Sequence, residues 1–501
     1  MSNVKRTSVA LIAVLTVSTL ASCAVGPDFK SPDAPAAAND GAYTPIPMPQ
    51  RTVAAPGAAG AAQRFSPGQD IPAQWWLVFH SDALDRLIRS SLSRSPNLAA
   101  AQAALRQAQE TLNARTGALL YPDVDGKLGV TRETAVPGTT AAPAGSLFTL
   151  YNASVNVTYT LDVFGASRRE LEGLRAAVDY QRFQVEAAYL ALTSNLVTAA
   201  IRESSLRAQL QATREVLAAQ ERQLAIIEKQ FAAGAIARSP VLVQRTQVAQ
   251  TRATLPPLEK SLAQTRHQLS VYVGKLPSES GMPEFQLDSL QLPVDLPVTL
   301  PSSLVRQRPD IQASEALLHE ASAQIGIATA KLYPQITLSG SAGSAALEAG
   351  KLFGPGSELW SIGAGLLQPI FNGGALTARR RAAIAAYDQA AAQYRAIVLT
   401  AFQNVADALR ALDFDASALK AQADAESLAR ESLELATRQY QLGAVSYLAL
   451  LDAQRSHQQA RVGLAQAQAA RYADTAALFQ ALGGGWWNRE PLADISRTNH
   501  D

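Results

Sequence analysis

Residues 151–165 read YNASVNVTYTLDVFG, and their side chains alternate between apolar and polar. The segment that follows is rich in Ala, Gln, Leu, Arg and Glu, which favour helix. In an extended strand the alternation places five apolar side chains on one face, those of Val155, Val157, Tyr159, Leu161 and Val163. The stretch therefore predicts a two-faced strand within a chain that is otherwise mainly helical.

This strand belongs to a pattern that occurs twice, which indicates a tandem duplication. Each copy reads as helix, strand, loop, strand, very long helix, turn and helix. Three pairs of matching segments carry the repeat: LYP at 120–122 and 332–334, DVFGAS at 162–167 with PIFNGG at 369–374, and KQFAAGAIARSPVLVQRTQ from 229 with RQYQLGAVSYLALLDAQRS from 438. We place the first repeat at 73–275, a Pro-rich linker at 276–307, the second repeat at 308–485 and a C-terminal tail at 486–501.

The long helices are predicted at 166–233 and 375–442. Each lies between two glycines that are separated by 68 residues without a proline. At roughly 1.5 Å per residue, each helix would be about 100 Å long. Leucines spaced by seven residues, among them Leu210, Leu217 and Leu224, are typical of a structural coiled-coil seam.

Four strands are predicted, at about 124–133, 151–163, 335–342 and 359–367. Their length and alternation fit a membrane β-barrel, although a half-buried sheet of a soluble domain fits the periodicity equally well. Four strands cannot close a membrane barrel, and open edges are not tolerated in lipid. A barrel would therefore be shared between chains, with eight strands and a filled interior for two copies, or twelve strands and a passage for three.

The N-terminus favours the membrane interpretation. Residues 1–22 have the layout of a secretory signal, with Lys5 and Arg6 before a short apolar run. They end in LASC, which resembles the lipobox of bacterial lipoproteins, so we expect covalent lipid on Cys23; the alternative is a buried free cysteine. Cys23 is the only cysteine, which excludes an internal disulfide. Ala24 after it implies sorting to the outer membrane, where acyl chains would hold the protein.

Composition bounds the remaining possibilities. The formal net charge is +2 with 17% charged residues, so nucleic acid is not an expected partner. Residues 31–70 are rich in Pro, Ala and Gly without periodicity, and we interpret 23–72 as a lipidated, extended N-terminal tether.

Four further segments, together with the duplication, resemble the TolC family of outer-membrane efflux proteins, closest to its lipoprotein branch of the NodT and OprM type. They are CAVGPDFKSP from 23, WWLVFHSDALDRLI from 75, RPDIQASEALLHEASAQIGIATAKLYPQITLSGS from 308 and QLGAVSYLALLDAQRS from 441.

The resemblance implies a homotrimer in the outer membrane. Its four strands per chain would form a twelve-stranded β-barrel, which continues into a twelve-helix periplasmic α-barrel with an equatorial belt. It also implies a passive exit duct for drugs or other small molecules, which works with a periplasmic adaptor protein and an inner-membrane transporter of the RND type. The tryptophans at 75, 76, 486 and 487 would then lie in the belt or at the membrane interface, and we favour packing in the belt.

The resemblance further implies a periplasmic gate near the helix-tip turns at Gly234 and Gly443. Leu448 and Asp452 match the leucine and aspartate that close the tunnel, and a trimer would place each in a ring of three. The alternative for Asp452 is a surface carboxylate paired with Arg455. Tyr440 matches a family tyrosine that joins a hydrogen-bonded latch, and a packing role fits it equally well.

Two departures from the family stand in the same region. Ala449 replaces a second aspartate, so a double acidic ring is not expected. Pro240 occupies a position in the first copy where an aspartate is common, which weakens an ion pair between the copies there.

No enzyme is expected from this sequence. The five histidines, at 80, 267, 319, 457 and 500, lack metal-ligand spacing, so no metal site is predicted. We find no nucleophile elbow, P-loop or dinucleotide fingerprint. The alternative function is a non-conducting, lipid-anchored periplasmic coiled coil that tethers the envelope; long helices and an acyl anchor fit it, but four alternating strands between helices do not.

Overall fold

The computed structural model describes residues 24–33, 43–134, 145–279, 281–299 and 301–489. The predicted signal, the proposed lipid attachment at Cys23 and most of the C-terminal tail lie outside these residues. The chain divides into two compact units. The strand unit comprises Met1–Pro32, Ala104–Arg182 and Ala313–Arg395, and the core unit comprises Asp33–Ala103, Phe183–Gln312 and Ala396–Asp501.

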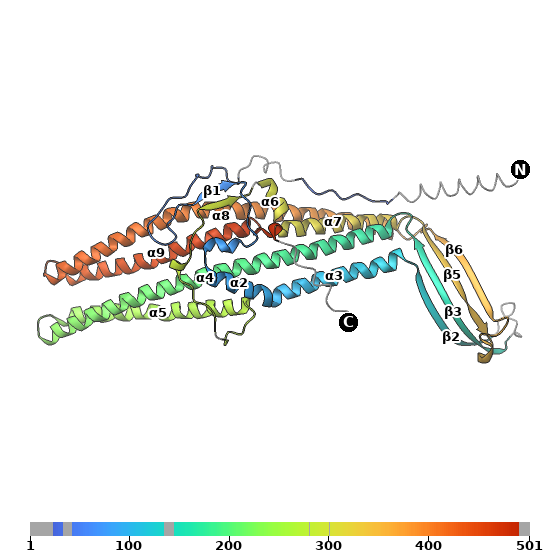
Figure 1. The fold of residues 1–501 in the computed structure, drawn as a ribbon, viewed down its shortest axis with the longest axis horizontal. Coiled ribbons are helices and arrows are strands. Elements are labelled where there is room, and N and C mark those ends of the chain that lie inside the picture. Colours follow the sequence, from blue (N-terminus) through green and yellow to red (C-terminus); the bar gives the residue numbers. More distant parts are fainter. Residues whose placement is uncertain (1–23, 34–42, 135–144, 280, 300, 490–501) are drawn as a thin grey trace. The chain divides into compact units, whose positions relative to one another are not determined.

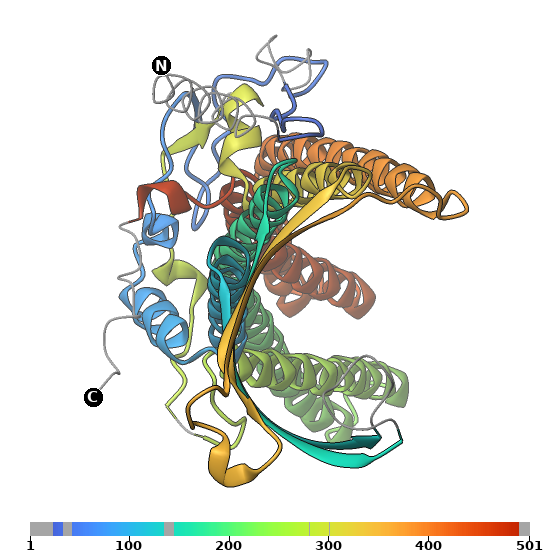
Figure 2. The same ribbon diagram turned by 90° about the vertical axis from the view of Figure 1, so that its right-hand side faces the viewer.

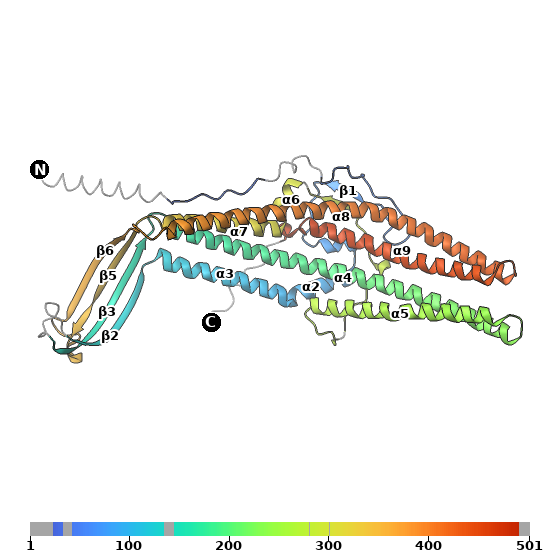
Figure 3. The same cartoon turned by 180° about the vertical axis from the view of Figure 1, so that it is seen from behind.

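The strand unit contains one antiparallel sheet in the order β2-β3-β5-β6. Figures 2 and 3 show its four strands side by side, forming a curved surface. Each strand includes most or all of a range predicted from the alternation. The bounds are β2 Asp123–Thr134, β3 Leu147–Leu161, β5 Gln335–Ala346 and β6 Glu358–Leu367.

The register keeps most of the apolar side chains of the four strands on one face. Val124 lies opposite Val157, Val157 opposite Gly340, and Gly340 opposite Ile362. The neighbouring row, on the other face, is polar and consists of Asp125, Asn156, Ser341 and Ser361. Because side chains alternate along every strand, the sheet presents one apolar and one polar face.

The helices of the two repeats match in length. Helices α4 (Ala166–Ala232) and α8 (Ala375–Gln441) have 67 residues each, and both run from the strand unit into the core unit. Helices α5 (Arg238–Tyr272) and α9 (Tyr447–Ala481) have 35 residues each. Figure 1 shows α4 beside α5 and α8 beside α9, as two helical hairpins. Shorter helices α3 (Pro96–Leu120) and α7 (Pro309–Ala330) precede β2 and β5.

An aromatic core stabilises the core unit. The 3-10 helix η2 (Trp75–Phe79) and helix α2 (Asp82–Arg94) pack there against the end of α9. Trp75 is fully buried and stacks on Phe479, with ring centroids 5.6 Å apart. Burying such aromatic side chains removes a large apolar area from water. Trp75 and Trp76 therefore serve packing, as we favoured, rather than a membrane interface.

The prediction of an extended tether at 23–72 is wrong in part, because much of this segment is folded. Strand β1 (Arg64–Pro67) pairs in parallel with β4 (Asp295–Val298) from the linker between the repeats. Gln63 is fully buried, and its side chain contacts α9. The linker likewise holds structure beyond β4, namely η3 (Leu287–Ser289) and α6 (Pro301–Gln307). These pairings join residues more than two hundred positions apart, so the local sequence pattern does not predict them.

Two further 3-10 helices complete the described elements, η4 (Ala349–Lys351) between β5 and β6 and η5 (Trp486–Asn488) after α9. Among the described residues, no helix combines the length and apolar character needed to cross a bilayer.

Candidate functional site

The two helix tips share one backbone geometry. After α4 the amide of Ala235 donates to the carbonyl of Gln230 at 2.9 Å, and after α8 Ala444 donates to Gln439 at 2.8 Å. Gly234 and Gly443 have φ of +74° and +72°, which only glycine adopts readily. This arrangement closes a helix with a left-handed glycine. The predicted tip turns are therefore found at both glycines, but the first ends before Pro240, which lies in the first turn of α5, where proline is tolerated.

The predicted gate residues lie just beyond the second tip. Leu448 is 63% exposed, and the side chain of Asp452 is 78% exposed, both on the first turns of α9. Asp452 is 3.9 Å from Arg455, a loose ion pair of the kind that contributes little at a surface. A single chain thus leaves both side chains open to solvent.

Tyr440 has an aromatic contact in this region. Its ring lies 5.5 Å from that of Tyr447, at an angle of 55°. This contact joins the end of α8 to the start of α9 and agrees with a packing role for Tyr440 in the single chain.

The hydrogen bonds that join the two hairpins near the tips come from residues that sequence reasoning missed. The hydroxyl of Tyr447 donates to Oε1 of Gln244 across the hairpins, and within the first hairpin Nε2 of Gln244 donates to the carbonyl of Gln220 at 2.8 Å. One turn along, Nε of Arg455 donates to Oε1 of Gln247 at 2.8 Å. The signal was weak, because a glutamine on a long polar helix face looks like any solvated residue.

The burial of these groups makes the contact between the hairpins specific. Gln244 is fully buried and Gln247 is 5% exposed. Burial raises the pKa of the Tyr447 hydroxyl, so it remains a hydrogen-bond donor at neutral pH. A buried amide that lost its partner would carry an unsatisfied polar group, so this latch (Gln220, Gln244, Gln247, Tyr447 and Arg455) favours one arrangement of the tips.

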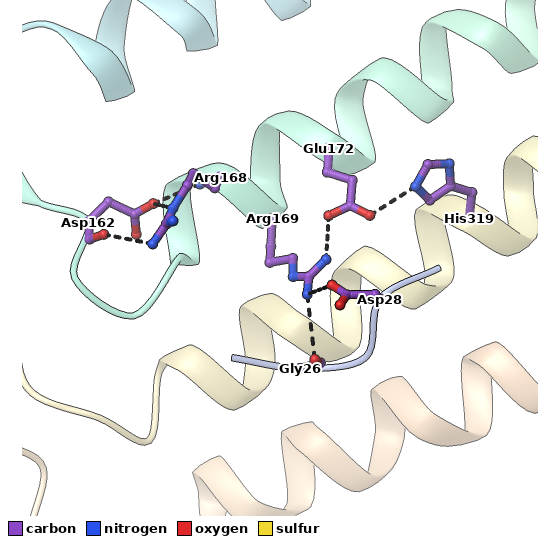
Figure 4. A network of polar contacts seen from close by, with 7 residues as sticks. All are labelled: Gly26, Asp28, Asp162, Arg168, Arg169, Glu172 and His319. Atoms are coloured by element: carbon purple, nitrogen blue, oxygen red, sulfur yellow. Dashed lines mark hydrogen bonds and ion pairs between the residues drawn. The ribbon is translucent and has the colours of Figure 1, made fainter. Parts of the chain in front are cut away.

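A second polar network lies in the strand unit, where the residues after Cys23 are held (Figure 4). The guanidinium of Arg169, whose side chain is 7% exposed, donates to Asp28 at 2.7 Å and to the carbonyl of Gly26 at 3.5 Å. Nη1 of Arg169 donates to Glu172 at 2.7 Å, and the other oxygen of Glu172 lies 2.9 Å from Nε2 of His319. Charge-assisted bonds of this kind are the stronger hydrogen bonds of proteins.

The same segment is also fixed by its backbone. The amide of Val25 donates to the carbonyl of Phe164 at 3.1 Å, three residues after the end of strand β3. Phe29 stacks on His319 at 4.2 Å. Gly26 has φ of +106° and passes so close to Gly326 that a Cβ would lie 2.5 Å from its Cα. The chain is therefore held two residues after the predicted lipid attachment, at the junction between sheet and helix.

The core unit holds a third polar cluster, in which a charge is buried. Arg471 of α9 is fully buried and donates to Oε1 of Gln63 at 2.6 Å. Burial raises the pKa of the Asp474 carboxyl to about 8, and a hydrogen bond and charge repulsion from Asp415 act in the same direction, whereas Arg471 opposes them. Within the described residues, no group of three His, Cys, Asp or Glu side chains is arranged to hold a metal ion.

A curved sheet with one apolar face, continued by long helices from two repeats, defines a class of outer-membrane channel. The family model described as "Outer membrane efflux protein" matches residues 87–275 and again 300–484. The chain belongs to this family, and the double match confirms the tandem repeat. Family members are channels rather than enzymes, and the protein is an outer-membrane efflux channel, which excludes the alternative of a non-conducting tether.

Particular relatives extend over nearly the whole chain. The pyoverdine export outer membrane protein OpmQ of Pseudomonas aeruginosa is 33% identical over 430 residues, which cover 84% of this chain and 89% of OpmQ. The probable outer membrane lipoprotein SilC of Salmonella typhimurium is 29% identical over 480 residues, 95% of this chain and 98% of SilC. The structure of the outer-membrane channel OprN superposes with a TM-score of 0.82 at 27% identity, covering 93% of this chain and 100% of OprN.

Proposed function

We propose that three copies of this chain form the exit duct of a tripartite efflux system. The observation that carries the proposal is the sheet with two open edges. Among the described residues, β2 and β6 each pair with one neighbour only. A sheet of that kind cannot stay open in lipid, because its edge amides and carbonyls would lack partners. Pairing β6 of one copy with β2 of the next satisfies both edges.

Twelve strands would leave a passage, whereas eight would be filled by side chains. In this arrangement the apolar face of each sheet meets lipid and the polar face lines the passage. The apolar residues of β6, such as Trp360 and Ile362, would continue into those of β2, such as Leu128 and Val130. All four are exposed in the single chain, from 64% for Val130 to 83% for Ile362, which suits a lipid-facing band.

The gate is proposed at the tips. In a trimer Leu448 and Asp452 would each form a ring of three, with the leucines excluding water and the carboxylates repelling anions or holding a cation. The hydrogen bonds from Tyr447 and Arg455 to the buried glutamines of α5 would hold the two hairpins of a copy together in the closed state. Opening then requires these hydrogen bonds to break or exchange partners. Tyr440 is proposed to support Tyr447 through their ring contact.

We propose covalent lipid on Cys23 as the second membrane attachment. No other bound group is proposed. The likeness to SilC supports it, since SilC is described as a lipoprotein. Substitution Cys23→Ser should abolish incorporation of labelled palmitate, and retained label would rule out this site.

The partners are proposed from the same family. A periplasmic adaptor would meet the helix tips, and an inner-membrane transporter of the RND type would supply energy. OpmQ exports pyoverdine; for this chain we propose drugs or other small molecules as cargo. The duct itself would perform no catalytic chemistry.

Electron microscopy and light scattering of the detergent-purified protein test the assembly. A hollow particle with the mass of three chains is expected. A monomer, or a solid rod, would contradict the shared barrel. Conductance of the reconstituted protein in planar bilayers then tests the passage, and a closed trimer that conducts only after gate substitutions would locate the barrier at the tips.

A further inference from the structure

The duplication places the same two aromatic residues at the sheet-to-helix junction of each copy. A tyrosine stands in LYP before the first strand of a copy, at Tyr121 and Tyr333. A phenylalanine follows the second strand, at Phe164 and Phe371. The repeat therefore supplies two tyrosines and two phenylalanines in equivalent positions within the strand unit.

One tyrosine and one phenylalanine meet inside the chain, and they come from different copies. Phe164 follows β3 and Tyr333 precedes β5, and their rings stack with centroids 4.8 Å apart and planes 19° apart. Strands β3 and β5 are hydrogen-bonded neighbours in the sheet. The stack thus accompanies the seam at which the first copy joins the second, and stacked aromatic pairs stabilise beyond the area they bury.

The other two rings are exposed in the single chain. Phe371 is 90% exposed and Tyr121 is 67% exposed, and Ile370 beside Phe371 is 95% exposed. Tyr121 precedes β2 and Phe371 follows β6, the two edge strands of the sheet. Two adjacent large apolar side chains with this exposure are unusual on a surface that contacts only water, and such patches mark interaction sites.

We infer that Phe371 of one copy stacks on Tyr121 of the next copy and closes the seam between chains as Phe164 and Tyr333 close the seam within one. This inference rests on the proposed trimer. The partner is a second copy because the exposed pair flanks the edge strands β6 and β2 in the same way that the stacked pair flanks β3 and β5. The repeat therefore specifies which surfaces meet.

The two copies differ at this junction in one respect. A single residue, Gly165, separates Phe164 from α4, whereas Asn372, Gly373 and Gly374 separate Phe371 from α8. The second turn is two residues longer and carries φ of +62° and +81° at its glycines. The longer turn presents Phe371 outside its own chain, as contact with another copy requires.

Cysteine cross-linking of the full-length protein in outer membranes tests the contact. The variant Tyr121→Cys/Phe371→Cys, treated with a short bifunctional thiol reagent, should give covalently linked dimers and trimers on a denaturing gel. The matched control is Phe164→Cys/Tyr333→Cys, which should link only within a chain and run as a monomer. Each single variant alone should remain unlinked, and two single variants expressed together should give dimers.

The outcomes separate this inference from the proposed function. A mass of three chains without cross-linking between 121 and 371 would overturn the stack and leave the trimer intact; the rings would then face lipid or solvent. A monomeric mass for the unaltered protein would instead overturn the proposed trimer.

A second measurement applies where the cysteine variant fails to assemble. Phe371→Ala should lower the temperature at which the detergent-solubilised trimer dissociates, and Phe371→Tyr should preserve it. Equal dissociation temperatures for Phe371→Ala and the unaltered protein would likewise overturn the stack.

Discussion

The two helical hairpins have the same backbone and different chemistry. Each has a 67-residue helix, a short glycine turn and a 35-residue helix. At equivalent positions after the turn, α5 carries Ser239 and Val243 where α9 carries Leu448 and Asp452. The two copies of the repeat thus share helix lengths of 67 and 35 residues. The side chains at the two tips nevertheless differ in size and charge.

The hairpins also differ along their shorter helices. Pro256 and Pro257 lie inside α5, whereas α9 has Ala465 and Gln466 at the same points. A proline within a helix removes a hydrogen bond and bends the helix. Further along, α9 carries the buried Arg471 where α5 has Leu262. The second hairpin thus holds both the proposed gate and the buried Arg471, which has no charged counterpart at the matching position of α5.

The largest effect is expected at Arg471. Replacing it by the residue of the first hairpin, Arg471→Leu, should lower the free energy of unfolding by about 3 kcal/mol, because buried polar partners such as Gln63 lose a charged donor. The measurement is denaturant unfolding in detergent, followed by circular dichroism. A loss as small as that of the surface variant Arg430→Leu would show that the two hairpins tolerate the same residue here.

A pH dependence is expected from Asp474, which has Thr265 as its counterpart in the first hairpin. Burial and the neighbouring Asp415 raise its pKa from 3.8 to about 8, so the folded state keeps a proton that the unfolded state releases. Its contribution to stability is fully present below about pH 4 and is lost as pH rises through about 8.

The variant Asp474→Asn tests the sign of this dependence. Its stability relative to the unaltered protein should increase as pH rises from 4 to 8, measured as thermal unfolding at each pH. Asp424→Asn, at an exposed position, is the control. If the difference in stability between Asp474→Asn and the unaltered protein stayed constant from pH 4 to 8, Asp474 would not be the source of the pH dependence.

Substitutions at the proposed gate should change conductance in the second hairpin but not in the first. Leu448→Ala combined with Asp452→Ala should increase single-channel conductance several-fold in planar bilayers, because it removes both proposed rings from the axis. The matched variant Val243→Ala in the first hairpin should leave conductance unchanged. Equal effects of the two, or none from the double variant, would contradict the assignment of the gate to the second tip.

The smallest effect concerns the start of the shorter helices. Ser446 caps α9 by accepting from the amide of Ala449, whereas Ala237 at the start of α5 makes no side-chain cap. Ser446→Ala should destabilise by about 1 kcal/mol, and Ala237→Ser should stabilise the first hairpin by a few tenths to about 1 kcal/mol. Hydrogen exchange of the first-turn amides would measure both, and opposite signs are the expected result.

Much of this fold could be predicted from local sequence. Alternation located the four strands, and long runs without proline located α4 and α8, because these patterns are produced within the element itself. Gly234 and Gly443 marked the tips because a helix end with positive φ favours glycine. The repeat then fixed the order of elements in both copies. Leu448, Asp452 and Tyr440 came only from resemblance to the family, and their roles in the gate stay predictions.

Contacts between residues far apart in sequence depend on the fold and could not be predicted from local patterns. Tyr447 with Gln244, Arg471 with Gln63, and Arg169 with Asp28 join residues separated by 203, 408 and 141 positions. The segment expected to be an extended tether similarly gained strand β1 by pairing with β4. The sequence around these residues carries no periodic pattern that predicts the pairs, because burial and hydrogen bonding at these sites depend on which elements pack together. Local sequence thus sufficed for the four strands of the sheet and the long helices, whereas β1, β4 and the buried polar pairs depend on packing between distant segments.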